Sequence, residues 1–374
     1  MEHVDFVVVG GGIAGASVGY ELAARGSVIL LEREATAGYH TTGRSAAVFT
    51  EVYEQGPVRA LTRAGRSFFE DPPDGFVDYP LFSSHLPLLF VARDDQMDSI
   101  AELQASAETP DEVELLEGEA LRSVCPVLRE DRLAAGLLEP LSMEIDVHEL
   151  HQAFLRGLRR RQGRVLTGTG VDGLEHDGST WTVTAGPVTV TTPVVVNASG
   201  AWCDDVAELA GVAPIGLVPM RRTAFAFDPE GHDLAGWPMV IDIDEDFYFK
   251  PEKAQLMGSL ADETPMSPHD VRPDEIDVAL AIERIAEATT FEIRHVRRTW
   301  AGLRTFSSDR LPVVGFDQDH PGFFWLGGQG GFGIMTSPAL SRAATGLICE
   351  GVIPPDLADA GVAAADLDPG RFRA

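Results

Sequence analysis

Short apolar runs alternate with helical stretches along the chain, and their order predicts its first structural unit. Residues 5–9 form a β-branched apolar run, a glycine turn follows, helical spacing continues to Gly26, and a second apolar run ends at Glu32. A short apolar run bounded by turn residues is typical of a buried strand, whereas apolar spacing of three and four residues is typical of a helix. The chain is therefore predicted to begin with a strand–helix–strand unit.

The same patterns predict later elements. Helical spacing recurs in four further segments, residues 56–70, 97–107, 146–163 and 273–290. Asp146 is the expected N-cap of the third of these helices. Alternating residues at 179–185 and 188–192 predict a small antiparallel hairpin, and a strand, a glycine turn and a helix recur at 193–211 and 322–351.

Composition and charge restrict the class of protein. The chain has 374 residues, of which 44% are hydrophobic and 23% charged, which is ordinary for a soluble globular protein with more than one core. Its 29 basic and 58 acidic side chains give a formal net charge of −29, and this charge would repel nucleic acid and anionic membranes. No apolar run of membrane-spanning length and no secretory signal pattern is found, so we expect a cytoplasmic protein.

The cysteine pattern argues against thiol and metal chemistry. Cys125, Cys203 and Cys349 are scattered and form neither a CxxC pair nor an even set. Neither a disulfide framework nor a structural zinc site is therefore expected, and we predict no metal site. Any redox chemistry is not that of a thiol.

The first glycine turn has the spacing of a dinucleotide site. Gly10 permits a tight turn, Gly12 lets the backbone approach a pyrophosphate, and Gly15 lets the helix pack closely. Glu32 follows at the distance of an acid that binds ribose hydroxyls. The glycines alone are also compatible with a plain tight turn, and the motif does not distinguish NAD from FAD, since both contain an ADP half.

Several strings resemble the D-amino-acid oxidase superfamily of flavoenzymes, in order and over the whole chain. They are GGGIAG with Glu32, HTTGRSAA, VVVNASGAW, WAGLR and WLGGQGGFGIMTSP. Within the superfamily, strings such as GYHTTGRSAA, NASGAWCD, RRTAF and FYFKP look most like the bacterial D-arginine dehydrogenases.

The resemblance implies an α/β fold with an α+β substrate layer and non-covalently bound FAD. A Rossmann-like FAD-binding domain would comprise residues 1–50, 146–217 and 295–374, and a discontinuous antiparallel-sheet substrate-binding domain would comprise residues 51–145 and 218–294. Binding would be non-covalent because Gly302, which has no thiol, lies near the position of the family's covalent cysteine. Covalent attachment through His40 is the alternative.

The resemblance also implies which residues contact the cofactor. Besides Gly10, Gly12, Gly15 and Glu32, they are Ile13, Ala14, Arg33, Thr42, Arg44, Ser45, Ala46, Val171, Ala198, Gly200, Trp202, Gly302, Gly328, Gly330, Gly331, Gly333 and Ile334. Without the family context, the HTTGRSAA string is equally compatible with a surface turn that caps a helix.

Oxidation of an amino acid by flavin transfers a hydride from the α-carbon to flavin N5, so the substrate carboxylate must be held in place. The resemblance assigns this role to Arg222 and Arg304, with Tyr53 and Tyr248 as hydroxyl donors and the Gly331 carbonyl for the amine. The planar fork of arginine suits a carboxylate. Taken singly, an arginine is usually a solvated surface residue, and Tyr248 is compatible with a buried strand position.

The substrate pocket departs from that of the D-arginine dehydrogenases. The acid that grips the guanidinium is replaced by Pro87, and a pocket histidine is replaced by Val48. A buried cation without a partner costs about several kcal/mol. The sequence therefore predicts a D-amino-acid dehydrogenase or oxidase of amino-acid catabolism that favours neutral apolar side chains, such as D-Leu, D-Met or D-Phe, over D-arginine.

Three alternatives stay open at this stage. A mobile loop could place Glu51, Asp242 or Asp244 in the pocket and restore a cation site. The chain could instead be a glycine or sarcosine-type oxidase of N-methyl amino acids, or a flavin-binding module without amine chemistry, although such a module has no use for a carboxylate clamp. The electron acceptor is either dioxygen or a quinone. A flavin hydroxylase is disfavoured because its late GD-type motif is absent.

Overall fold

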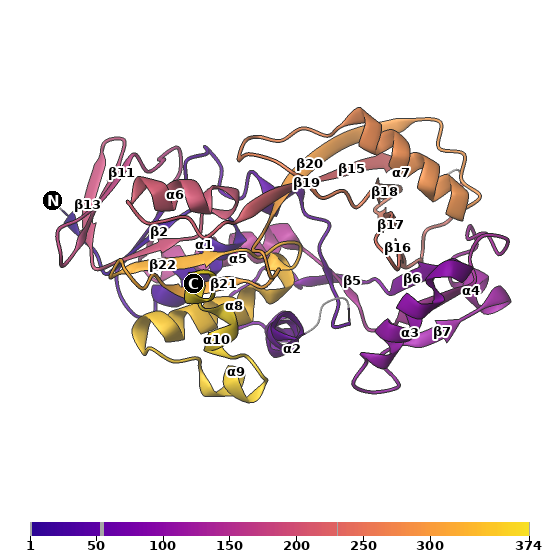
Figure 1. The fold of residues 1–374 in the computed structure, drawn as a ribbon, viewed down its shortest axis with the longest axis horizontal. Helices are drawn as coiled ribbons and strands as arrows, with labels where there is room; N and C mark the ends of the chain where they lie inside the picture. The colour runs from indigo at the N-terminus through magenta and orange to yellow at the C-terminus, as the bar shows by residue number, and fades with distance from the viewer. Residues whose placement is uncertain (1, 53–55, 230, 374) are drawn as a thin grey trace.

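The computed structural model describes residues 2–52, 56–229 and 231–373. Two lobes lie side by side, and the long strands β15 (Val218–Phe227) and β20 (Val296–Phe306) extend between them (Figure 1). No helix in the described part of the chain combines the length and apolar character that a bilayer crossing requires.

A six-stranded sheet forms the centre of the first lobe, in the order β10-β3-β2-β14-β22-β21. Its parallel strands are β2 (Phe6–Val9), β3 (Val28–Leu31), β10 (Arg164–Leu166), β14 (Val194–Asn197) and β22 (Phe323–Gly327), and β21 (Val313–Phe316) is antiparallel to β22. Phe6 and Val8 pack on one face, and Val7 and Val9 pack on the other. Because both faces are buried, these strands are continuous apolar runs.

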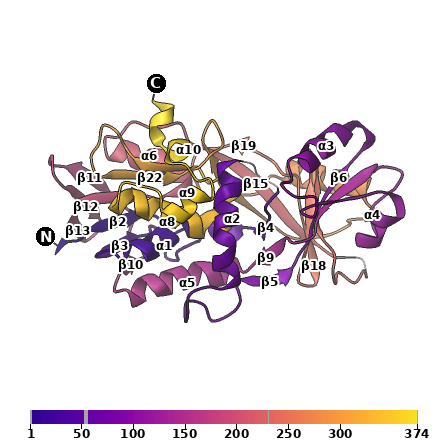
Figure 2. The same ribbon diagram turned by 90° about the horizontal axis from the view of Figure 1, so that it is seen from below.

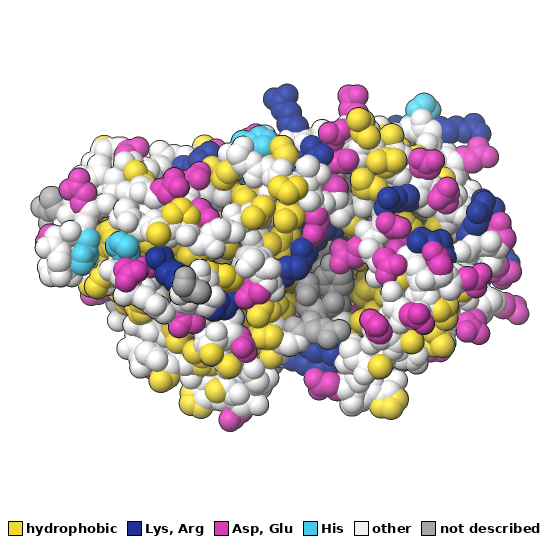
Figure 3. Space-filling view, viewed as in Figure 1, with side chains coloured by type: hydrophobic (Ala, Val, Ile, Leu, Met, Phe, Trp, Pro, Cys, Tyr) yellow, Lys and Arg dark blue, Asp and Glu magenta, His cyan; other side chains and the backbone are white. Residues whose placement is uncertain are grey.

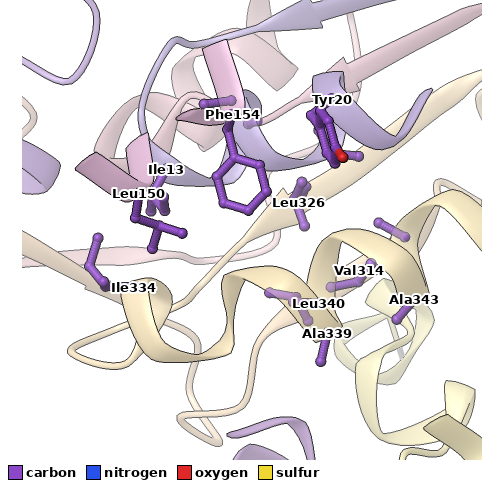
Figure 4. Close-up of a cluster of buried hydrophobic side chains, with 14 of the residues drawn as sticks. Ile13, Tyr20, Leu150, Phe154, Val314, Leu326, Ile334, Ala339, Leu340 and Ala343 are labelled. Atoms are coloured by element: carbon purple, nitrogen blue, oxygen red, sulfur yellow. The ribbon is translucent and has the colours of Figure 1, made fainter. Parts of the chain in front are cut away.

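Three helices cover one face of this sheet, namely α1 (Ile13–Leu22), α5 (Val147–Arg160) and α8 (Gly333–Cys349). Figure 4 shows the cluster that they form, with Tyr20 of α1, Phe154 of α5 and Leu340 of α8 beside Leu326 of the sheet. The predicted cap of α5 is confirmed, because the Asp146 carboxylate accepts a hydrogen bond from the Glu149 amide. The short helices α9 (Pro355–Asp359) and α10 (Ala364–Leu367) follow at the C-terminal end.

The other face of the sheet is covered by helix α6 and a four-stranded sheet. These are α6 (Cys203–Leu209) and the strands β1 (Glu2–His3), β11 (Gly173–His176), β12 (Trp181–Ala185) and β13 (Val188–Thr192). Trp181 and Val183 of β12 are buried against this face. Strands β12 and β13 pair antiparallel, which confirms the predicted hairpin.

The second lobe is built on a nine-stranded mixed sheet. Besides β15 and β20 it contains β6 (Leu88–Ala92), β7 (Glu114–Leu116), β8 (Ala135–Glu139), β16 (Met239–Asp242), β17 (Tyr248–Glu252), β18 (Gln255–Ser259) and β19 (Thr264–Pro265). Helices α4 (Gly118–Val124) and α7 (Glu275–Ala288) pack on one face and α3 (Met97–Ala105) on the other. The sheet was expected to be antiparallel, but β6 and β16 run parallel, because a long excursion of the chain separates them.

Two kinds of element join the lobes. One is a three-stranded sheet of β4 (Val48–Phe49), β9 (Met143–Ile145) and β5 (Phe82–His85). The other is helix α2 (Pro57–Glu70), which crosses the middle of the molecule in Figure 2 and packs on α8 of the first lobe. The predicted α/β fold class is confirmed.

Candidate active site

A cavity lies at the carboxyl ends of β2, β3 and β14, where ligands bind in open α/β sheets. The glycine loop between β2 and α1 forms its floor. Gly10 has a φ of 106°, and a Cβ there would lie 2.5 Å from the carbonyl oxygen of Ala198. A Cβ at Gly15 would lie 1.9 Å from the carbonyl oxygen of Gly10. Only glycine therefore allows this tight turn and the close approach of α1.

Glu32 stands at the end of β3 and is 8% exposed. Its Oε2 accepts a hydrogen bond from the Gly11 amide at 2.8 Å, and its Oε1 accepts one from the Glu34 amide at 2.8 Å. Each carboxylate oxygen has a second lone pair, so Glu32 can also accept hydrogen bonds from ribose hydroxyls in the cavity.

His151 of α5 binds the backbone of the glycine loop, and it was not identified from the sequence. Its Nε2 donates to the Gly11 carbonyl at 2.8 Å, and its ring lies against Gly38. Burial lowers the pKa of His151, and His148 acts in the same direction, against the hydrogen bond to Gly11. The only available signal was a polar residue on the apolar face of the predicted helix, beside Leu150 and Phe154.

The HTTGRSAA segment is a short 3-10 helix, η1 (Thr41–Arg44), that contacts both lobes. The Thr42 hydroxyl oxygen accepts from the Ile13 amide at 3.0 Å, and the Thr41 hydroxyl donates to the Leu303 carbonyl at 2.7 Å. Arg44 Nη1 donates to the Ala301 carbonyl at 2.9 Å. The segment is therefore built into the site and is not a surface turn.

A second cavity continues from the first. Both are lined by Gly12, Thr41, Thr42, Ala198, Gly200 and Ala201. All residues that the sequence assigned to the cofactor line one of the two cavities, except Gly15, which acts through packing. The long connected space fits the extended shape of a dinucleotide. Cys125 and Cys203 are buried and line neither cavity, and burial raises the pKa of each thiol to about 12.

The ribbon of β15 and β20 presents the predicted clamp. Arg222 lies opposite Gly302, and Ala224 lies opposite Trp300. Directly opposed residues share a face, as do residues two apart on a strand, so Arg304 projects from the same face as Arg222. Both arginines line the second cavity, and the missing side chain at Gly302 leaves space between them.

The two arginines have different surroundings. The guanidinium of Arg304 has no hydrogen-bond or ion-pair partner among residues 2–52, 56–229 and 231–373, and it lies against Gly331, where a Cβ would be 2.8 Å from Nη1. Arg222 is 7% exposed, donates from Nε to the Asp262 carbonyl at 3.0 Å and from Nη2 to Glu263 Oε1 at 3.2 Å. Arg304 is thus the more available of the two for a ligand.

Tyr248 lies beside the arginines. Its ring centre is 5.9 Å from the guanidinium carbon of Arg222, and its side chain lines the cavity. Tyr248 is buried on strand β17, but its hydroxyl makes no hydrogen bond with any described residue. The alternative in which a backbone group satisfies this hydroxyl is therefore not observed among the described residues. Tyr53, the other expected hydroxyl donor, lies outside the described residues.

A third, smaller cavity opens beyond the clamp and is largely apolar. It is lined by Ser45, Ala46, Ala47, Val48, Thr50, Leu88, Arg222, Met239, Ile241, Tyr248, Arg304, Gly331, Ile334 and Met335. Val48, which the sequence assigned to the substrate pocket, is among these lining residues. Pro87, the other residue assigned to the substrate pocket, does not line this cavity, whereas its neighbour Leu88 does. The Pro87 carbonyl accepts a hydrogen bond from the Met239 amide at 2.8 Å.

The acids that a loop could have brought into the pocket are engaged elsewhere. Glu51 pairs with Arg63 and Arg66 of α2. Asp242 and Asp244 both accept hydrogen bonds from the amide of Gln96. None of these three acids lines the apolar cavity.

Two further carboxyl groups occupy strand positions opposite residues of this lining, but neither group lines the cavity itself. Glu139 is opposite Leu88 and accepts hydrogen bonds from the Thr50 hydroxyl and the Glu51 amide, and burial raises its pKa. Glu144 is opposite Val48, and Lys250 Nζ lies 2.6 Å from its Oε1. Burial alone would raise the pKa of Glu144, but the charge and the hydrogen bond of Lys250 hold this pKa below its ordinary value. Both groups are satisfied by protein partners.

A βαβ nucleotide site continuous with an apolar pocket that carries two arginines is the arrangement expected of an oxidoreductase that holds a dinucleotide beside its substrate. The profile of the family described as "DAO: FAD dependent oxidoreductase" matches residues 5–347, and the chain belongs to this family. FAD is its cofactor, as predicted.

Two relatives are similar over nearly the whole chain. Mitochondrial dimethylglycine dehydrogenase of Rattus norvegicus is 24% identical over 99% of this chain, which spans only 45% of the rat protein's length. Hydrogen cyanide synthase subunit HcnC of Pseudomonas aeruginosa is 25% identical, with 95% of this chain and 94% of that protein covered.

Solved structures share the fold. L-proline dehydrogenase from P. horikoshii has a TM-score of 0.85 at 22% identity, with 100% of this chain and 98% of that chain covered. Glycine oxidase from Geobacillus kaustophilus has a TM-score of 0.83 at 21% identity, with 97% and 99% covered. These comparisons confirm the predicted superfamily and give no support for a particular closeness to the D-arginine dehydrogenases.

Proposed function

We propose that the chain oxidises small amino acids with neutral, apolar side chains, and that D-amino acids such as D-Leu and D-Met are its substrates. One observation carries this proposal. Arg222 and Arg304 are the only charged residues among the described residues that line the pocket, and the rest of its wall is largely apolar. A pocket of this kind fits a carboxylate at one end and a hydrocarbon side chain at the other.

The residues of the chain bind and orient the substrate. Arg304 donates hydrogen bonds to the carboxylate, because its guanidinium is the one without a protein partner in the described part of the chain. The Tyr248 hydroxyl donates a further bond, and the Gly331 carbonyl accepts from the amine. Bound FAD supplies the acceptor for the two electrons that leave the substrate when the amine becomes an imine.

The described lining of the pocket offers no counter-ion to an ammonium group. Neither a carboxyl nor an imidazole group stands among its described lining residues, so we propose that the amine binds in its neutral form. The same absence disfavours D-arginine, because a buried guanidinium without a partner costs about several kcal/mol.

A second candidate is oxidation of glycine or of an N-substituted amino acid. It is favoured by the names of the similar proteins, which include a dimethylglycine dehydrogenase, a glycine oxidase and an L-proline dehydrogenase. A flavin-binding module without amine chemistry is disfavoured by Arg304, since its guanidinium faces the cavity with no protein partner among the described residues, which a module that only binds flavin does not require.

The test is anaerobic mixing of the FAD-loaded protein with D-Leu, D-Met, D-Phe, D-Arg, their L-isomers, glycine, sarcosine, dimethylglycine and proline, while the absorbance of oxidised flavin is followed. Fast bleaching by apolar D-isomers is expected. Best efficiency with D-Arg contradicts the proposal, best efficiency with the N-substituted compounds selects the second candidate, and no bleaching selects the module. Admission of air afterwards distinguishes dioxygen from a quinone-type acceptor.

Arg304→Met tests the clamp itself. Loss of charge-assisted bonds to a desolvated carboxylate is expected to raise KM by about 100-fold or more, with FAD content unchanged. Arg297→Met is the matched control, since Arg297 is on the same strand with a 57% exposed side chain. Equal KM values for Arg304→Met and the control would remove Arg304 from substrate binding.

A further inference from the structure

We infer that Glu263 sets the charge of the clamp and restricts the pocket to substrates with a single carboxylate. This inference rests on the proposed function, because it concerns the same two arginines. It assigns Glu263 a role in specificity, although Glu263 does not itself line the apolar cavity.

Glu263 lies between two arginines. Its Oε1 is 3.2 Å from Arg222 Nη2, and Arg310 approaches both oxygens, with Nη2 at 2.8 Å from Oε1 and Nη1 at 3.0 Å from Oε2. Burial alone would raise the pKa of Glu263, but the charges of Arg310, Arg222 and Arg304 hold it below its ordinary value. The group is therefore a carboxylate at neutral pH.

The turn before Glu263 fixes this arrangement. The Asp262 side chain accepts hydrogen bonds from the amide of Thr223 at 2.6 Å and from its hydroxyl at 3.1 Å, while the Asp262 carbonyl accepts from Arg222 Nε at 3.0 Å. Ala261 is buried with a φ of 57°, a conformation that a non-glycine residue keeps only where its surroundings impose it. Glu263 thus has a defined place beside Arg222.

The consequence concerns the two arginines that line the pocket. Arg222 already faces a carboxylate, which it shares with Arg310, whereas Arg304 has no carboxylate partner among the described residues. Arg304 is therefore the site for one substrate carboxylate. A second one would have to approach Arg222 next to the negative charge of Glu263, and like charges at short range repel strongly where water is excluded.

Glu245 provides an internal comparison. It also approaches Arg222 Nη2, but at 3.8 Å and with a side chain that is 37% exposed, so solvent screens its charge more. Glu263, at 3.2 Å from Arg222 Nη2 and 29% exposed, is the nearer and less exposed of the two carboxylates, so its charge acts more strongly on Arg222.

The experiment uses the FAD-loaded full chain and two unreactive probes of equal length, propionate and malonate. Binding is measured from the shift of the flavin absorbance, so no turnover is needed. The natural protein is expected to bind propionate more tightly. Glu263→Gln is expected to change the ratio of the two dissociation constants by about tenfold or more in favour of malonate. Glu263→Asp keeps the charge and should keep the preference, and Glu245→Gln should change the ratio by less than about twofold.

The outcomes separate the readings. An unchanged ratio in Glu263→Gln overturns the inference, and equal weakening of both acids shows a merely structural role and overturns it as well. A natural protein that binds neither probe also overturns it. If the probes behave as expected but no amino acid bleaches the flavin, the proposed function fails while the role of Glu263 in selecting acids stands.

Discussion

Single residues in this site are held mainly by the backbone. Both oxygens of Glu32 accept from amides, Arg222 donates to the Asp262 carbonyl, and His151 donates to the Gly11 carbonyl. Backbone partners are fixed by the fold and do not change rotamer. Each of these side chains is therefore sensitive to small changes of geometry.

His151→Leu is expected to destabilise the protein by about 1–3 kcal/mol, because it leaves the buried Gly11 carbonyl unpaired. Denaturant unfolding of the FAD-loaded protein measures this loss. His151→Gln can still donate to the carbonyl and should lose less. Equal losses in the two variants would show that shape rather than the hydrogen bond matters.

The same residue predicts a pH dependence. The pKa of His151 is lowered in the folded protein, so between that value and about 6.5 the unfolded chain binds the extra proton. Unfolding free energy should therefore decline as pH falls below about 6.5. His151→Leu should show a shallower decline over this range, and parallel curves would exclude the contribution.

At the scale of elements, the approach of α1 to the glycine loop decides whether the cofactor site forms. Helix α1 begins at Ile13, directly after the loop, and Gly15 lies in its first turn against the Gly10 carbonyl. Any side chain at Gly15 must push the helix away from the loop.

Gly15→Ala is expected to cost about 1–3 kcal/mol or more of unfolding free energy and to reduce the FAD bound after purification. Gly19→Ala is the control on the same helix, since its Cβ would meet only the flexible ends of side chains, Leu158 at 3.3 Å and Leu30 at 3.7 Å. The ratio of flavin to protein absorbance is the measurement. Full FAD content in Gly15→Ala would contradict the packing argument.

The sequence could predict a feature only where the residues that form it are close together along the chain. The turn at Gly10 and the cap at Asp146 depend on local chain, so pattern alone predicted them. His151 and Glu263 act on Gly11 and Arg222, which lie 140 and 41 residues away, and no pattern connects them.

The wall of the pocket shows a second limit. The sequence pointed to Pro87, but Leu88 lines the cavity. A shift of one residue along an extended segment turns the side chain to the opposite side, so an alignment error of that size changes the chemistry assigned to the wall.

The whole molecule is strongly acidic, with a net charge of −29. Figure 3 shows acidic side chains spread over the lobe that carries α4 and α7. A field of this sign slows the approach of anions and falls off with added salt.

The rate at which ferricyanide reoxidises the dithionite-reduced protein should therefore rise severalfold as ionic strength increases from about 10 to about 150 mM. A neutral quinone provides the control and should show little change. Stopped-flow absorbance of the flavin gives both rates. A rate with ferricyanide that is independent of salt would show that the net charge does not govern access to the flavin.

The clamp and the wall belong to different strands. Arg222 and Arg304 sit on the paired strands β15 and β20, whereas Val48, Leu88 and Met239 come from β4, β6 and β16. Mutations that enlarge or reshape the apolar cavity can therefore accumulate without disturbing the two arginines proposed to bind the carboxylate. If that proposal holds, descendants of this chain can change their substrate through mutations in the wall alone, while the carboxylate-binding residues are inherited unchanged.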